Sequence, residues 1–335
     1  MFKNRESIIK TKQTIACGVL AVILAFSFAA CPVEDDLTNW KAISNSTFGK
    51  FHIRAIVYGN GRFVAVGESG RMAYSDDGVS WTAVSDSTFS TGSKGIICAI
   101  AYGIADGASV GRFVAGGQEG KMAYSDDGET WTAVSNSTFG SYDINGIAYG
   151  NNRFVAVGES GRMAYSTDGE SWKAVADSKF RSYDINGIAY GNNRFVAVGG
   201  GITKIAFSTN GEGWGEVVYV PFSSTINAIA YGNNMFVAGS EDGDKAYSFS
   251  GVTWSYLGTS PLTASFGRIN AIAYGNGSFV VVGWNGKMAY SDNVSYDWTA
   301  VENSTFGTTW INAIAYGNGR FVAGGQEGKM AYADW

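Results

Sequence analysis

Histidine, cysteine and proline are scarce in this chain of 335 residues, and each scarcity excludes a class of site. The single histidine, His52, excludes a metal site built on several histidines, and a Ser-His-Asp triad would need that same residue. Of the three cysteines, Cys17 and Cys31 lie within the first 31 residues, so Cys98 stands alone in the rest of the chain. No intramolecular disulfide is therefore expected.

Basic residues are also fewer than acidic residues. The whole chain has 24 Lys and Arg against 29 Asp and Glu. Residues 1–30 hold four of the basic residues and one acid, so the remainder carries 20 against 28, a net charge of −8. Such a chain has no basic surface to attract a phosphate backbone, so nucleic acid is not an expected partner. No residue pattern predicts a cofactor or a bound metal, and we expect a monomer.

The N-terminal segment is the one long apolar run. Four basic residues in the first twelve precede a mainly apolar stretch from Thr14 to Ala30, which is typical of a secretory signal. The cysteine that follows resembles the bacterial lipoprotein signal, in which Cys31 would carry lipid and become the mature N-terminus. This resemblance predicts a signal peptide over 1–30 and a tether over 31–37. The chain would be secreted across the inner membrane and held by lipid in the bacterial cell envelope, on its periplasmic or surface face. An uncleaved membrane anchor is the alternative.

Glycine and aromatic residues are abundant, and they recur in a phrase of about forty residues that is repeated seven times. The clearest copy runs from Ile144 to Val175, and the last ends the chain at Trp335. Eight of the ten tryptophans mark the period, at intervals of 37 to 50 residues. They stand at positions 40, 81, 131, 172, 214, 254, 298 and 335. A fixed period of this length is typical of units that must stack on their neighbours to bury their apolar faces.

Each copy divides into four short apolar runs separated by turn residues, which predicts four strands. Four strands per forty to forty-five residues is the spacing of a β-propeller blade. We therefore predict an all-β fold over residues 38–335, a seven-bladed β-propeller of four-stranded antiparallel blades. Only six fourth strands lie between the seven sets of first, second and third strands. The seventh is the segment from Trp40 to Ser44, so the N-terminal strand is predicted to close the ring.

The turn between the third and fourth strands has a recurring sequence, Ser75-Asp76-Asp77-Gly78 followed by Val79-Ser80-Trp81 in the first copy. This sequence resembles the Asp-box, or bacterial neuraminidase repeat, of sialidases, sortilin-type receptors and other secreted propellers. Ser and Asp side chains can bond turn amides, and Gly accepts a positive φ. The resemblance implies a fold rather than a reaction, and we interpret these aspartates as structural.

A sialidase-like glycoside hydrolase is the enzyme that this resemblance brings into question. That family uses an arginine cluster, a Tyr/Glu nucleophile pair, an acid/base Asp and an Arg-Ile-Pro start. The only prolines are Pro32, Pro221 and Pro261, and no Arg-x-Pro occurs. The tyrosine that ends the first strand recurs in every copy, which indicates a framework role. We therefore do not expect an enzyme.

A basic residue opens the third strand of every copy, as Arg71, Lys121, Arg162, Lys204, Lys245, Lys287 and Lys329. It could form a charged ring for an anionic ligand. The interpretation that we favour is a surface ion pair with a nearby acid such as Glu68, copied when the unit was duplicated.

Positions that do not repeat are the candidates for function. The residue before the first strand varies, and the residue after the first isoleucine is mostly asparagine. Both lie at the end of the ring where propellers usually bind, close to the turn between the second and third strands. The candidate ligand-binding residues are His52, Arg54, Asp143, Asp184, Arg268, Trp284 and Trp310. The asparagines could instead only cap strand ends.

These observations predict a lipid-anchored, extracytoplasmic propeller that is non-catalytic and binds or scaffolds a protein or a glycan. A sialidase-like hydrolase and an envelope assembly factor are the alternatives.

Overall fold

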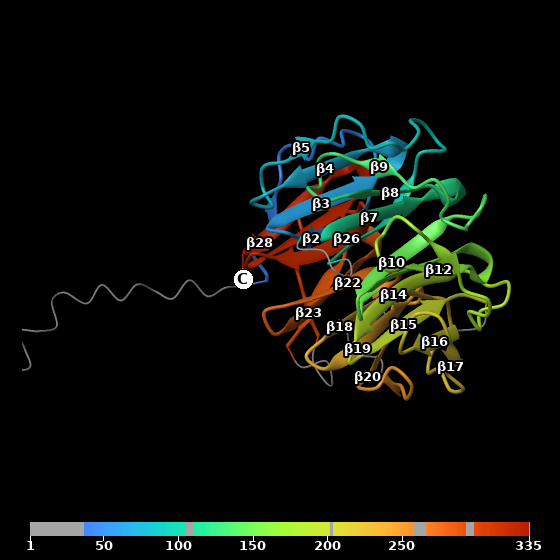
Figure 1. Ribbon diagram of the computed structural model, residues 1–335. Helices are drawn as coiled ribbons and strands as arrows, with labels where there is room; N and C mark the ends of the chain where they lie inside the picture. Colours follow the sequence, from blue (N-terminus) through green and yellow to red (C-terminus); the bar gives the residue numbers. More distant parts are fainter. Residues whose placement is uncertain (1–36, 105–109, 202–203, 258–265, 293–297, 335) are drawn as a thin grey trace, which may run out of the picture. The chain divides into compact units, whose positions relative to one another are not determined.

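The computed structural model describes residues 37–104, 110–201, 204–257, 266–292 and 298–334. Over these ranges the chain forms seven four-stranded antiparallel sheets, which are the blades of the predicted seven-bladed β-propeller (Figure 1). No helix in this described part is long and apolar enough to cross a membrane. The predicted signal peptide, the lipid-bearing Cys31 and most of the tether lie outside the described residues and stay predictions.

The blades are numbered 1 to 7 in the order of their first strands. The first strands are β2 (Ile53–Gly59), β6 (Ile97–Gly103), β10 (Ile144–Gly150), β14 (Ile185–Gly191), β18 (Ile226–Gly232), β22 (Ile269–Gly275) and β26 (Ile311–Gly317). The second strands are β3 (Arg62–Gly67), β7 (Arg112–Gly117), β11 (Arg153–Gly158), β15 (Arg194–Gly199), β19 (Met235–Ser240), β23 (Ser278–Gly283) and β27 (Arg320–Gly325).

The third strands are β4 (Met72–Ser75), β8 (Met122–Ser125), β12 (Met163–Ser166), β16 (Lys204–Ser208), β20 (Lys245–Ser248), β24 (Met288–Ser291) and β28 (Met330–Asp334). The fourth strands are β5 (Thr82–Ala83), β9 (Thr132–Ala133), β13 (Lys173–Ala174), β17 (Gly215–Glu216), β21 (Ser255–Tyr256), β25 (Thr299–Ala300) and, in blade 7, β1 (Lys41–Ala42).

The second strands form the buried middle layer of each blade. Phe154 to Val157 of β11 are all fully buried, because the neighbouring blades cover both faces of the sheet. This burial on both faces explains why the second strands are continuously apolar. The fourth strands are shorter than predicted, with two residues each, because the tryptophan before the strand turns inward. Trp131 packs between blades 1 and 2, and its indole Nε1 donates to the carbonyl of Gly128 at 3.2 Å.

Ring closure by the N-terminal strand is confirmed. β1 pairs with β28 in antiparallel register, with Lys41 opposite Tyr332 and Ala42 opposite Ala331. Leu37 and Trp40 are buried in the cluster that joins blades 6 and 7. In Figure 1 the red C-terminal strands β26 and β28 accordingly lie beside the blue strands near the N-terminus.

Neighbouring blades pack closely where each first strand ends. Tyr102 of blade 2 covers Gly59 of blade 1 so closely that a Cβ on this glycine would stand 2.1 Å from the tyrosine Cγ. The same contact recurs at every junction, for Gly103 under Tyr149, Gly150 under Tyr190, Gly191 under Tyr231, Gly232 under Tyr274, Gly275 under Tyr316 and Gly317 under Tyr58. Each tyrosine also tilts against the phenylalanine opposite it, as Tyr102 does on Phe113 at 4.8 Å between ring centroids. The framework role predicted for these tyrosines is confirmed.

Lys245 is not equivalent to the other basic residues that open third strands. It pairs with Gly239, as Met72 pairs with Val66, so it occupies the position of a core methionine. Only 2% of Lys245 is exposed, and its ammonium lies 5.3 Å from the centroid of the Trp298 ring. Burial lowers the pKa of Lys245 to about 8. The sequence comparison misaligned this copy by one residue, and in a strand one residue moves a side chain from the surface to the core.

We predict that deletion of residues 37–44 destabilises the propeller by roughly 3–6 kcal/mol, because burial of Leu37 and Trp40 is lost and the edge of β28 is exposed. Urea unfolding measures the change. Lys41→Ala is the control and should cost less than about 1 kcal/mol, since its ion pair with Asp334 is half-exposed. An unchanged unfolding midpoint in the deletion variant would contradict closure by this strand.

We also predict that Lys245→Met stabilises the protein in a pH-dependent way. Below pH 8 both the folded and the unfolded wild type carry the charge, so the folded state bears the full burial cost. Above about pH 8 the folded state loses its proton first, and the cost disappears by pH 10.5. The free energy of unfolding of the variant should therefore exceed that of the wild type by roughly 3 kcal/mol at pH 7 and by little at pH 10.5. Urea unfolding at the two pH values measures this difference. An equal gain at both pH values would show that the charge is not responsible.

Candidate functional site

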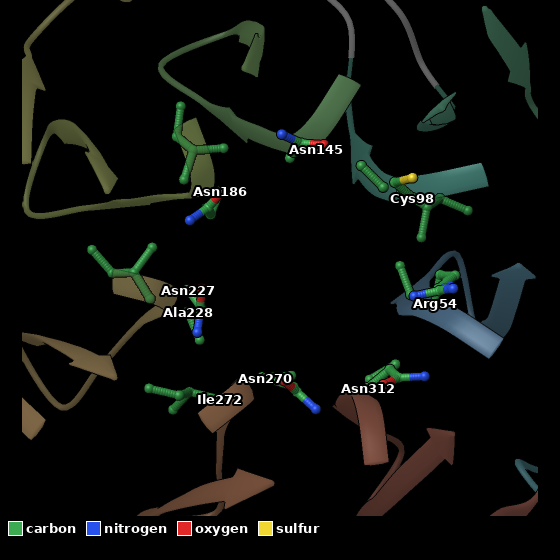
Figure 2. Close-up of a pocket in the computed structure, with 18 of the residues that line it drawn as sticks. Arg54, Cys98, Asn145, Asn186, Asn227, Ala228, Asn270, Ile272 and Asn312 are labelled. Atoms are coloured by element: carbon green, nitrogen blue, oxygen red, sulfur yellow. The ribbon is translucent and has the colours of Figure 1, made fainter. Parts of the chain in front are cut away.

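The seven first strands line the central channel of the ring. Each has a register irregularity after its first isoleucine, as between Ile144 and Gly146 in β10. The bulged residues are Arg54, Cys98, Asn145, Asn186, Asn227, Asn270 and Asn312. They surround one end of the channel (Figure 2) and line a cavity of about 190 Å³ with the small residues and isoleucines that follow them. We call this end the mouth.

Most of the mouth asparagines join one blade to the next. The Nδ2 of Asn145 donates to the carbonyl of Ile185, the first residue of the following blade, at 3.1 Å. The equivalent bonds run from Asn186 to Ile226, from Asn270 to Ile311 and from Asn312 to Ile53, at 2.9 to 3.0 Å. These four asparagines therefore have the framework role that we kept as an alternative. In Asn227 the same nitrogen is buried and has no partner among the described residues.

His52 and Arg54 form one cluster on blade 1 with Glu68. Glu68 accepts from the Arg54 guanidinium and from the backbone amide of His52 at 3.2 Å, and His52 Nδ1 lies 3.2 Å from the same carboxylate. Burial alone would raise the pKa of Glu68, but these donors hold it below its usual value. Sequence reasoning considered Glu68 only as a partner for the basic residue of the third strand.

The ion pairs predicted for the basic residues that open third strands are found in part. Lys121 lies 3.4 Å from Glu119, and Lys329 lies 3.9 Å from Glu327. Arg71 instead stacks over the Phe51 ring at 4.6 Å from its centroid. The partners differ because Glu119 and Glu327 are the second residues of their turns, whereas Glu68 is the first residue of its turn and bonds to His52 and Arg54.

Asp143 and Asp184 each hold a turn of the preceding blade. Asp143 Oδ1 accepts from the amide of Glu119 at 2.9 Å, and Asp184 Oδ1 accepts from the amide of Ser160 at 2.9 Å. Both donors have a positive φ, at 55° and 53°, so the carboxylates satisfy turns that are otherwise strained. These contacts join residues of two neighbouring blades, so they cannot be predicted from the sequence of a single repeat.

Arg268, Trp284 and Trp310 come together in blades 6 and 7. The two tryptophan rings meet edge to face at 6.3 Å, and 50% of Trp284 is exposed. Arg268 pairs with Glu241 of blade 5 at 3.0 Å and donates from Nε to Asn270 Oδ1 at 3.1 Å. The structure thus brings the candidates together in two clusters, on blade 1 and on blades 6 and 7, with the two aspartates apart from both.

Cys98 occupies a position that is asparagine in five other blades. Its thiol does not replace the asparagine bond to the next blade. Burial raises the pKa of its thiol to about 11, so the thiol is protonated at neutral pH and is a poor nucleophile. Among the described residues, no group of three or more His, Cys, Asp or Glu side chains could hold a metal ion.

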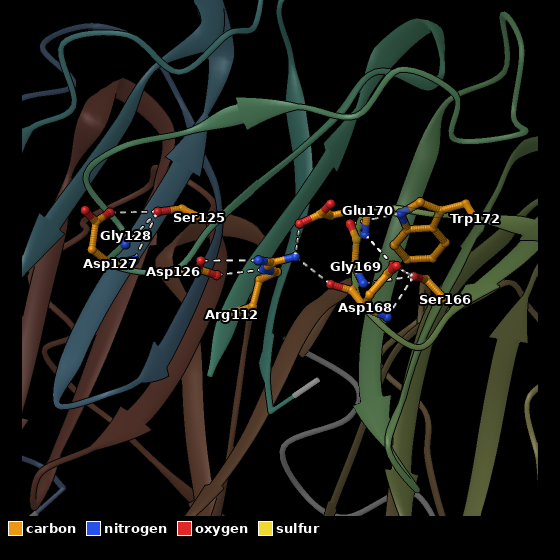
Figure 3. A network of polar contacts seen from close by, with 10 residues as sticks. All are labelled: Arg112, Ser125, Asp126, Asp127, Gly128, Ser166, Asp168, Gly169, Glu170 and Trp172. Atoms are coloured by element: carbon orange, nitrogen blue, oxygen red, sulfur yellow. Dashed lines mark hydrogen bonds and ion pairs between the residues drawn. The ribbon is translucent and has the colours of Figure 1, made fainter. Parts of the chain in front are cut away.

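The opposite end of the ring joins the blades through charged turns (Figure 3). Arg112 of blade 2 donates to Asp126 of its own blade at 2.7 Å, and to the Asp168 carbonyl and the Glu170 carboxylate of blade 3 at 2.8 and 2.5 Å. Corresponding bonds to the turn carbonyl of the next blade start from Arg62, Arg153, Arg194 and Arg320. Met235 and Ser278 replace the arginine in blades 5 and 6. We call each such arginine contact a latch.

The turns themselves are held by their serine and aspartate. Gly78, with φ at +74°, donates its amide to Ser75 Oγ at 2.8 Å. Burial alone would raise the pKa of Asp77, but the amides of Ser80 and Val79 and the Ser75 hydroxyl lower it to about 2. These polar groups are engaged within the turn, in agreement with the structural interpretation of the aspartates.

Similar folds occur among solved structures. YCF48 bound to a D1 peptide superposes with a TM-score of 0.69 at 15% identity, over 88% of this chain and 97% of that one. A catalytically inactive virginiamycin B lyase from Staphylococcus aureus with quinupristin gives 0.71 at 12% identity, over 89% and 99%. U3-55K gives 0.67 at 10% identity, over 90% and 100%. No family model and no curated protein matches the sequence. At these identities the likeness shows the propeller fold alone.

We predict that Cys98→Asn stabilises the ring by about 1 kcal/mol, because the new amide can donate to the Ile144 carbonyl as Asn145 does to Ile185. Cys98→Ala, which cannot donate, is the control, and urea unfolding compares the two. Equal midpoints would mean that the asparagine bond adds no stability at this junction.

Proposed function

We propose that the chain is a non-catalytic binding propeller that holds a segment of a protein partner across the mouth. The observation that carries the proposal is the difference between the two ends of the ring. At the opposite end the latches and turns engage the charged groups in framework bonds. At the mouth, Arg54, Cys98 and Asn227 have left the asparagine bonding pattern, and Trp284 is half-exposed.

The size of the cavity suits one side chain of a larger partner. Pockets that enclose a drug-sized molecule measure about 300–1,000 Å³, whereas this one measures about 190 Å³. A polypeptide could place one side chain in it and lay its backbone over the rim. The similar fold of YCF48, solved with a D1 peptide, supports a peptide ligand as an analogy.

A hydrolytic function has less support from the same residues. Arg54 and Arg268 are the arginines among the candidate site residues, and each is already bonded to a glutamate of a nearby turn. They lie on blades 1 and 6 and do not converge on one carboxylate site. The similarity to virginiamycin B lyase is one of fold, so it does not favour a catalytic function over a binding function. Lipid attachment at Cys31 is compatible with a binding role and is not required for it.

The test is selection of a phage-displayed library of random twelve-residue peptides on the purified propeller. A photo-crosslinking amino acid at Thr308, an exposed position at the mouth, should capture the enriched peptides. The same amino acid at Ser80, an exposed position in a turn of the opposite end, should not. Equal capture from both positions, or no enriched peptide, would falsify the proposal.

A further inference from the structure

Blade 6 lacks a side-chain hydrogen-bond acceptor that blades 1, 3 and 7 have, and blade 4, with Gly200 at this position, lacks it too. In blade 1 the first residue of the turn after the second strand, Glu68, accepts from the amide of His52 at 3.2 Å. Glu159 does the same for Asp143 in blade 3 at 3.1 Å, and Gln326 does so for Trp310 in blade 7 at 3.1 Å. In blade 6 this position is Trp284, and an indole has no oxygen to accept such a bond. A departure from the framework that costs a bond is expected where function requires it.

The indole of Trp284 is held in a defined place. It lies so close over Gly267 that a Cβ on this glycine would stand 2.8 Å from the ring. Trp310 meets it edge to face, at an interplanar angle of 75°. Half of Trp284 remains exposed, so the two rings form a rigid apolar corner that is open to solvent. We call Trp284, Trp310 and Gly267 the tryptophan corner.

Polar groups stand next to this corner. Arg268 follows Gly267 directly, and its guanidinium is held by Glu241 at 3.0 Å and by Asn270 Oδ1 at 3.1 Å. Its Nη2 lies 3.4 Å from Asn227 Oδ1, while Asn227 Nδ2 is buried and has no partner among the described residues. Hydrogen-bond donors therefore accompany the apolar surface, which suits a ligand that has carbonyl oxygens and a flat apolar ring.

We propose that the tryptophan corner anchors an extended, proline-containing peptide, with a proline ring stacked on Trp284 and backbone carbonyls facing Arg268. Aromatic clefts bind such segments because the polyproline II conformation is already ordered and its carbonyls are free. Two rings at a steep angle present a notch into which one flat ring fits. This inference rests on the proposed function and names the chemistry of its ligand.

The variant Trp284→Gln tests the anchor without weakening the framework. Glutamine supplies the acceptor found at Gln326, which offsets part of the lost indole packing, so the variant should melt close to the wild-type temperature. A fluorescein-labelled deca-proline peptide and the library-selected peptides should lose at least tenfold in affinity by fluorescence anisotropy. Phe249→Ser is the matched control, since Phe249 is 58% exposed in a turn of the opposite end, and it should bind like the wild type. A glycine-serine decamer should not bind the wild type.

The outcomes separate the two proposals. Selected peptides that bind Trp284→Gln as tightly as the wild type would overturn the corner and leave the proposed function standing. No binding of deca-proline and no proline among the selected peptides would likewise overturn the corner. A glycan array that shows sugar binding dependent on Trp284, with no peptide binding, would overturn both. If Trp284→Gln melts lower than the wild type, Trp310→Thr, which takes the residue of blade 5 at this position, replaces it in the same assay.

Discussion

The contact of a tyrosine with a glycine at the end of each first strand is the constraint on which this ring depends. A Cβ on Gly59 would overlap the Tyr102 ring at 2.1 Å, so the neighbouring strands can come this close only because glycine ends each first strand. The same pair recurs at every junction, including the one from Gly317 to Tyr58 that closes the ring. Seven equal junctions divide the circle evenly, and this leaves the width of the channel little freedom.

Once this spacing is set, the two ends of the ring serve different needs. The latches bind turns to the next blade, as Arg112 does across to Glu170, and they start from blades 1 to 4 and from blade 7. At the mouth the four framework asparagines perform the corresponding task with uncharged bonds. Arg54 and Cys98 can replace members of this pattern without opening the ring, because the tyrosine contacts remain.

The number of blades and the closing strand could be predicted because the buried tryptophans recur at blade spacing, and Trp40 precedes the first set. The contacts of Asp143 could not, because its partner is a backbone amide of the preceding blade. Lys245 was placed wrongly because a shift of one residue in a strand exchanges surface for core. Of the candidate site residues, Arg54 lines the cavity at the mouth. The others lie directly before the first strands or in the turn that follows β23, and only the contacts in the structure distinguish those that support the framework from those that leave a surface exposed.

Because the chain repeats itself, equivalent positions in different blades can be compared, and this comparison distinguishes framework residues from candidates for binding. His52 and Trp310 vary in identity, yet each keeps its amide bond to the glutamate or glutamine of the turn, so variation there leaves the framework unchanged. Trp284 varies and also removes the acceptor. Half of its side chain stays exposed, so the fold does not use this part of the aromatic surface. A change that costs the scaffold a bond and exposes an aromatic face is better explained by contact with another molecule than by stability, and this makes Trp284 the most informative residue of the mouth.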